Sequence, residues 1–146
     1  MKYTQEIELK LPRARVVELF DNPDNLTKWQ PELISFKHES GQPGHPGAKS
    51  RLKYKMGKRD FDLVETIIRR NLPDEFSGSY EMKGVLNIVQ NRFIEAGHNK
   101  TQWVCDNEFQ FQGIGMKLMS WFFPGMFRKQ SFKFMEQFKS FAEKNG

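Results

Sequence analysis

The sequence predicts an α+β domain in which a curved, seven-stranded antiparallel sheet wraps around one long C-terminal helix. Three observations support this fold class. The first residues alternate between polar and apolar side chains, which is the period of a strand. The same period of two recurs over about 80 residues after Glu32. The C-terminal quarter instead carries apolar residues at helical spacing. A chain of 146 residues can bury a core of its own, so one domain over residues 1–146 is expected.

A strand and two short helices open the predicted fold. Residues 3–11 alternate, which indicates a strand with one buried face that carries Ile7, Leu9 and Leu11. Pro12 suits the first turn of a helix over residues 13–20. The apolar face of this helix carries Val16, Leu19 and Phe20. That helix ends before Pro23, because the residue preceding a proline avoids the helical region. A second short helix is expected over residues 23–29.

Six further strands are expected to follow, over residues 32–40, 48–56, 59–70, 75–84, 85–97 and 101–111. Alternation assigns one face of these strands to the core, with Ile34, Phe36, His38, Leu52, Tyr54, Met56, Phe76, Tyr80, Met82, Trp103, Cys105, Phe109 and Phe111. Glu65 also lies on this buried face if its strand neighbours Leu63 and Ile67 face the core. For residues 85–97 two faces compete; the one with Asn87, Asn91 and Phe93 is preferred, since it buries amides and leaves an arginine in water.

The C-terminal helix is expected over residues 116–143, with a break in it. Pro124 removes one helical hydrogen bond, so the helix should kink or break at residues 123–125. Apolar side chains cover a wide arc before the proline and a narrow stripe after it. The apolar run is too short to span a membrane and is bracketed by Lys117, Arg128 and Lys129. We interpret the segment as a movable wall of a cavity between the sheet and the helix.

Composition and charge favour a cytoplasmic protein without an integral membrane segment. The N-terminus lacks the apolar region of a signal peptide, and no run of about 18 apolar residues occurs. The single cysteine, Cys105, excludes an internal disulfide and fits a reducing compartment. The net charge of +5 comes from scattered cations interleaved with acids, which predicts a solvated sheet face and no nucleic-acid partner.

No residue pattern indicates a catalytic or metal site, and no cofactor is expected. His38, His45 and His98 lack the spacing of metal ligands. The glycine-rich segment 41–47 leads into a strand instead of a helix, so it is interpreted as a mobile hairpin loop near the mouth of the cavity. Cys105 is expected to be an unreactive core thiol. Glu65, with His38 and Tyr54, is the candidate for acid–base chemistry.

Four stretches together resemble a known superfamily: LPRARVVELFDNPDNLTKWQPEL, SGQPGHPGAKSRLKY, VETI and FQFQGIGMKLMSWFFPGMFRKQSFKFMEQFKSFAE. The chain is similar to the START and Bet v 1-like (SRPBCC) superfamily, in its bacterial polyketide cyclase/dehydrase-like branch. The resemblance implies the helix-grip fold and a hydrophobic ligand, such as a lipid, a polyketide or an aromatic metabolite, held between sheet and long helix. It implies no shared catalytic residues.

The expected function is therefore binding or carrying of a hydrophobic small molecule. Two alternatives remain: an enzyme of the cyclase/dehydratase type that uses acid–base groups in the cavity, and a module that contacts a membrane surface or a protein. The oligomeric state is left open. Buried polar residues such as Asn107 are expected to hydrogen-bond either within a structural network or to the ligand. The expected pocket residues are Trp29, Phe36, His38, Tyr54, Glu65, Phe76, Tyr80, Asn91, Phe93, Trp103, Asn107, Phe109, Met119, Phe123 and Phe127.

Overall fold

The computed structural model of the protein describes residues 1–122 and 124–146, with Ser120 described in its backbone only. Its helices and strands follow the predicted order, with one more helix at the C-terminal end. In chain order they are β1 (Lys2–Leu9), α1 (Arg13–Asp21), the 3-10 turn η1 (Pro23–Asn25), α2 (Leu26–Trp29), β2 (Leu33–Ser40), β3 (Lys49–Met56), β4 (Arg59–Asn71), β5 (Glu75–Met82), β6 (Val85–Glu95), β7 (Thr101–Phe111), α3 (Ile114–Phe122) and α4 (Pro124–Asn145).

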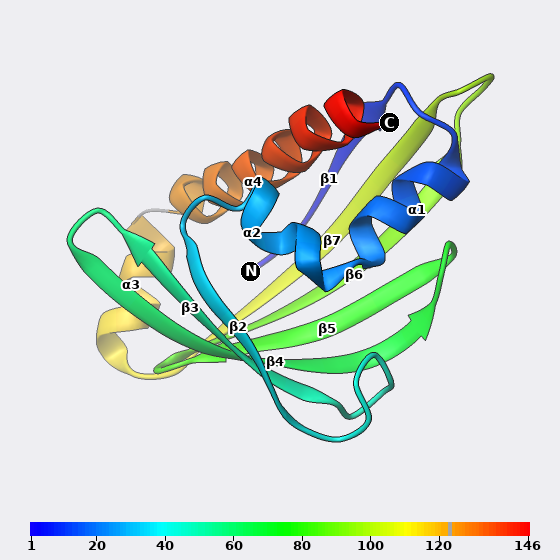
Figure 1. The fold of residues 1–146 in the computed structure, drawn as a ribbon. Helices are drawn as coiled ribbons and strands as arrows, with labels where there is room; N and C mark the ends of the chain where they lie inside the picture. The colour runs from blue at the N-terminus through cyan, green and yellow to red at the C-terminus, as the bar shows by residue number, and fades with distance from the viewer. Residues whose placement is uncertain (123) are drawn as a thin grey trace.

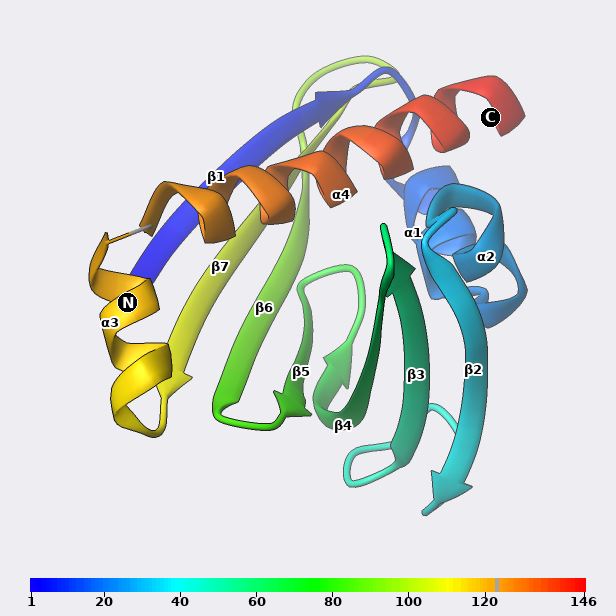
Figure 2. The same ribbon diagram turned by 90° about the vertical axis from the view of Figure 1, so that its left-hand side faces the viewer.

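The seven strands form one antiparallel sheet in the order β1-β7-β6-β5-β4-β3-β2. Sequential hairpins therefore build most of the sheet, and β1 completes it beside β7. The sheet is strongly curved, α4 lies along its concave side, and α1 with α2 covers one end (Figures 1 and 2). A straight helix cannot follow a curved sheet along its whole length, so part of the concave face is left without a helix against it.

The densest part of the core lies where α1, α2 and α4 meet β6 and β7. Phe138 of α4 is fully buried there. Its ring centroid lies 5.6 Å from that of Phe20, 5.2 Å from Trp29 and 5.4 Å from Trp103. Edge-to-face packing of this kind adds to the free energy gained from apolar burial. This cluster fixes α4 on the sheet at one end of the molecule.

The long C-terminal helix predicted over residues 116–143 is two helices. The predicted kink is confirmed by a change of direction between the two described helices, of which α3 ends at Phe122 and α4 begins at Pro124. The intervening Phe123 lies outside the described residues. α3 points away from the axis of α4 (Figures 1 and 2). Among the described residues, no helix has both the length and the apolar character needed to cross a bilayer.

The face predicted for Ile34 is wrong. The pairing of β2 with β3 shifts between Leu33 and Ser35, so the strict alternation breaks at that point. Leu33 is consequently buried and packs beside Leu52, whereas Ile34 is 51% exposed. Sequence alternation assumes an unbroken ladder, and one irregular residue is enough to exchange the two faces.

Candidate functional site

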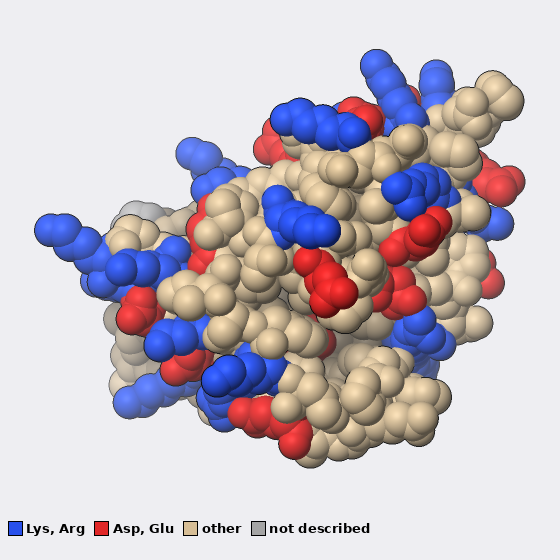
Figure 3. Space-filling view, in the orientation of Figure 1, with Lys and Arg blue, Asp and Glu red and all other residues tan. Residues whose placement is uncertain are grey.

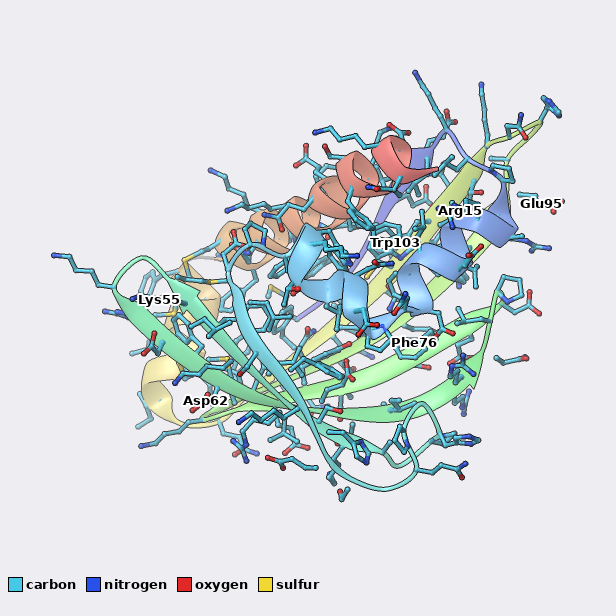
Figure 4. The ribbon with its side chains drawn as sticks, viewed as in Figure 1. Arg15, Lys55, Asp62, Phe76, Glu95 and Trp103 are labelled. Atoms are coloured by element: carbon cyan, nitrogen blue, oxygen red, sulfur yellow. The ribbon has the colours of Figure 1, made fainter. Side chains whose placement is uncertain are left out.

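A cavity of about 480 Å³ lies between the concave face of the sheet and α4. Side chains from β2 to β7, from the α1–α2 segment and from the first turns of α4 line it. Most of them are aliphatic or aromatic, with a few polar groups placed among them. Figure 3 shows the surface hollowed beside the α1–α2 segment. In Figure 4, Phe76 and Trp103 project from the sheet into this region, whereas Lys55 projects outward.

The structure brings twelve of the fifteen expected pocket residues around this cavity: Trp29, Phe36, His38, Tyr54, Glu65, Phe76, Tyr80, Asn91, Trp103, Asn107, Phe109 and Phe127. The preferred face of residues 85–97 is the one that lines it, since Asn87, Val89 and Asn91 all do. Strand alternation was therefore sufficient to place residues from six different strands on one wall.

Two expected pocket residues lie elsewhere, and one lies outside the described residues. Phe93 does not line the cavity: it is buried against Phe20 and Trp103, in the core beneath α1. Met119 is exposed, because α3 leaves the axis of α4 and takes that face away from the sheet. Of the expected movable wall over residues 116–132, the described residues that line the cavity are Phe127, Gln130 and Ser131, all on α4. Phe123 is the residue that the structure does not describe.

Glu65 and Tyr80 form the polar centre of the cavity. They are directly opposite each other on β4 and β5, and the Tyr80 hydroxyl lies near the Glu65 carboxyl. Burial raises the pKa of the Glu65 carboxyl, although the neighbouring Tyr80 hydroxyl acts in the opposite direction. Burial, together with the nearby Glu65, raises the pKa of Tyr80 well above its ordinary value. The pair therefore offers a carboxyl group whose protonated form is favoured by burial and a phenol that stays protonated.

Tyr54 stands close to this pair and makes a different contact. Its hydroxyl donates a hydrogen bond of 2.5 Å to Oε1 of Gln30, which follows α2. Burial raises the pKa of Tyr54, and the negative charges of Glu65 and Glu32 raise it further. The phenol is therefore a neutral donor that ties β3 to the α1–α2 segment. Sequence reasoning missed Gln30 because nothing in its local pattern shows that it faces inward.

Asn91 belongs to a structural network. Its Oδ1 accepts a hydrogen bond of 2.9 Å from Nε1 of Trp103, and its Nδ2 donates to the carbonyl oxygen of Phe76 at 3.3 Å. Both ends of the amide are therefore used within the protein. Asn107 is also bonded internally, since its Oδ1 accepts from Nδ2 of Asn87 at 3.4 Å. Of the two roles expected for these amides, a structural network or contact with the ligand, the hydrogen bonds support the structural network.

Cys105 lies on the same wall and is buried. Burial is the main cause that raises the pKa of its thiol to about 12, against a smaller opposite effect from Asn107. The thiolate is the reactive form of cysteine, so this side chain is unreactive near neutral pH. The described residues also contain no group of three or more histidine, cysteine or acidic side chains able to hold a metal ion.

Two residues that line the cavity carry a buried donor with no hydrogen-bond partner within the described part of the chain. They are Trp29, the last residue of α2, through Nε1, and Gln130 of α4, through Nε2. Buried donors are almost always paired in proteins, so these two atoms are exceptions. Gln130 and the neighbouring Ser131 were missed from the sequence. Their spacing of three and four residues after Phe127 is the signal that could have found them.

The mouth of the cavity is bordered by an ion pair between Arg70 of β4 and Asp21 at the end of α1. A second bond of the same pair joins Nε of Arg70 to Oδ1 of Asp21 at 3.3 Å. Pro43 and Gly44 of the β2–β3 loop line this region too, where the sequence placed the loop. Gly41 begins that loop with a φ of +77°, and a Cβ there would lie 2.8 Å from Cα of Ala48, so glycine is required.

The same architecture occurs in solved structures that share little sequence with this chain. An aromatase/cyclase, Zhui, from Streptomyces sp. R1128 superposes with a TM-score of 0.82 at 11% identity, over 98% of this chain and 93% of that one. A START superfamily protein from Mycobacterium smegmatis gives 0.80 at 8% identity, over 99% of both chains. The shared architecture is the helix-grip fold.

Other helix-grip structures extend the range of recorded activities. Norcoclaurine synthase from Thalictrum flavum, solved in complex with dopamine and hydroxybenzaldehyde, gives a TM-score of 0.74 at 12% identity, over all of this chain and 88% of that one. Identities this low show a shared fold and leave the ligand undetermined. No protein-family model and no curated protein matches the sequence.

Proposed function

We propose that the protein binds or carries a hydrophobic small molecule, such as a lipid, a polyketide or an aromatic metabolite, in the cavity between sheet and α4. The supporting observation is the cavity itself. Its volume of about 480 Å³ lies within the range of small-molecule sites, and apolar walls with a few polar groups are typical of such sites. The helix-grip neighbours include a cyclase and a START protein, which is consistent with a ligand at this place.

A ligand suited to this cavity combines an apolar body with at least one hydrogen-bond acceptor. The Glu65–Tyr80 pair offers such a ligand a donor and an acceptor on the cavity wall. Resemblance to the bacterial polyketide cyclase/dehydrase-like branch makes polyketides and aromatic ketones the first compounds to test.

A cavity-filling substitution tests the proposal. Leu63 lines the cavity, and Leu63→Trp should occupy part of it, whereas Ile68→Trp places the same side chain on a residue of the same strand that is 41% exposed. Fluorescence titration with N-phenyl-1-naphthylamine should show saturable binding to the wild type and to Ile68→Trp. Leu63→Trp should weaken it at least about tenfold, or about 1.4 kcal/mol. Equal binding by both variants would place the probe elsewhere and contradict the proposal.

A second candidate function is favoured by the Glu65–Tyr80 pair: an enzyme of the cyclase/dehydratase type. A carboxyl group with a raised pKa beside a neutral phenol is an arrangement suited to moving protons on a bound ketone. Model poly-β-ketone thioesters, followed by mass spectrometry, test it. An enzyme should form cyclised or dehydrated product, and Glu65→Gln should abolish turnover while retaining binding. If product forms at equal rates with both proteins, Glu65 has no catalytic role.

A further inference from the structure

The most exposed apolar surface among the described residues lies on α3. Ile114, Leu118, Trp121 and Phe122 are spaced four, three and one residues apart, so they share one face of this helix. Ile114 is 80% exposed, Trp121 77% and Phe122 68%. Met126, in the first turn of α4, is also exposed. These five residues are called the α3 patch.

The α3 patch is on the outside because the opposite side of the helix is held against the sheet. Met116 packs over the β5–β6 turn, where a Cβ on Gly84 would lie 3.0 Å from Cγ of Met116. The backbone N–H of Gln112 also donates to the carbonyl oxygen of Gly84 at 2.9 Å. Beyond the break, Phe127 packs on Phe109 and Phe111, with centroid distances of 5.1 and 5.2 Å. The exposed orientation of the patch is thus fixed from both ends.

Exposed apolar residues that share one helix face indicate a site of interaction with a protein or a membrane, because water solvates them poorly. Trp121 and Phe122, whose rings lie 5.6 Å apart, are residue types that favour the boundary between water and lipid. α3 is only nine residues long, about 14 Å at the rise of an α-helix, so it can lie in a membrane interface but cannot cross a bilayer.

The charge around the patch identifies the kind of partner. From Gln112 to Met135 the sequence has no aspartate or glutamate and four cations: Lys117, Arg128, Lys129 and Lys133. Lys and Arg side chains also project from the edge of the molecule at which α3 lies, Lys55 of β3 among them, with acids between them (Figures 3 and 4). An anionic surface complements this arrangement. A second copy of the chain would bring the same cations together across a two-fold interface.

We propose that the α3 patch docks the protein on the surface of an anionic lipid membrane, with Trp121 and Phe122 inserted into the interface. The patch lies directly before the turns of α4 that line the cavity, since Phe127, Gln130 and Ser131 all do. Docking would therefore hold that end of the cavity next to lipid. The inference needs no ligand in the cavity, so it can fail or succeed independently of the proposed function.

Vesicle sedimentation tests the docking. Wild-type protein should sediment with phosphatidylcholine vesicles that contain phosphatidylglycerol at an ionic strength of about 0.01 M, and binding should fall as salt shortens the Debye length. Trp121→Ser/Phe122→Ser should bind at least about tenfold more weakly. The matched control is Ile68→Thr/Ile94→Thr, which changes two exposed residues on the sheet and should bind like the wild type. Wild-type protein that stays in solution at low salt would overturn the proposal.

Fluorescence of the wild type gives a test without any variant. Trp29 and Trp103 are buried, so Trp121 is the tryptophan exposed to vesicles. Lipids brominated on their acyl chains should quench part of the emission if Trp121 inserts, and an unquenched spectrum would overturn the proposal. Analytical ultracentrifugation examines the competing partner. A concentration-dependent dimer that disappears in Trp121→Ser/Phe122→Ser would assign the patch to a second copy of the chain and overturn membrane docking.

Discussion

Glu65 and Tyr80 face each other across β4 and β5 inside a mainly apolar cavity. A carboxyl group in such a place loses solvation when it ionises, and one phenol replaces only part of the lost water. The position is therefore costly for the folded state at high pH. Its presence in a cavity wall is the feature that most clearly separates this cavity from a simple apolar void.

Glu65→Gln should stabilise the folded protein increasingly as the pH rises. Because the folded pKa of Glu65 is raised, its contribution to the free energy of unfolding is fully present below its unfolded pKa and is lost as the pH rises through the folded pKa. Glutamine keeps an acceptor for Tyr80 and carries no charge. Urea unfolding of both proteins from pH 4 to pH 8 measures this. A difference between the two that is constant across this range would contradict the assigned pKa direction.

Asn91→Leu should destabilise the protein by about 1–3 kcal/mol. Leucine has the branched shape of asparagine, although it is bulkier, and it leaves Nε1 of Trp103 without its acceptor in a buried position. The midpoint of urea unfolding measures the loss. Asn71→Leu is a suitable control, because Asn71 is exposed at the end of β4 and should change stability by less than about 0.5 kcal/mol. If both variants unfold at the wild-type midpoint, the Asn91–Trp103 bond is not stabilising.

Asp21→Ala should speed ligand exchange with little loss of stability. The ion pair with Arg70 joins α1 to β4 beside the mouth, and both side chains are partly exposed, so its contribution to folding is at most about 1 kcal/mol. Stopped-flow displacement of bound N-phenyl-1-naphthylamine should show a faster release. Arg69→Ala removes a neighbouring pair with Glu75 that does not border the cavity, and its release rate should match that of the wild type. Equal rates for Asp21→Ala and Arg69→Ala would show that the mouth does not limit exchange.

Cys105 should resist thiol reagents in the folded protein. With a pKa of about 12 and a buried position, its thiolate is a negligible fraction below pH 9. Absorbance after addition of a chromogenic disulfide reagent should show no more than slow reaction in buffer and one rapid equivalent in guanidinium chloride. Rapid, complete reaction of the native protein would mean that the cavity wall opens far more readily than the packing indicates.

The period-two pattern was enough to predict the sheet and most of the cavity wall. Tyr54, Phe76 and Phe109 all lie on the faces that alternation assigns to them, whereas alternation left the face of Glu65 conditional. Alternation gives no information about which strand residues stand opposite each other. The contact between Glu65 and Tyr80 depends on the register of β4 against β5. That register shifts between Ile67 and Arg69, and the local sequence does not predict the shift.

The C-terminal segment shows the other limit of sequence reasoning. Pro124 correctly predicts where the helix axis changes direction, because the missing N–H of proline is a local property. The direction of the preceding helix is a tertiary property. It depends on the packing of Met116 over Gly84, and these residues are distant from each other in the sequence. For this reason Met119 was expected in the cavity, whereas α3 carries it to the surface.

Native mass spectrometry of the protein, purified from its own cells under gentle conditions, tests the central claim most directly. The claim is that the cavity of about 480 Å³ holds a hydrophobic small molecule. The expected spectrum shows the chain with one additional small molecule, which is released on denaturation and is absent from Leu63→Trp. A spectrum with the mass of the polypeptide only, unchanged when an excess of N-phenyl-1-naphthylamine is added, would contradict it.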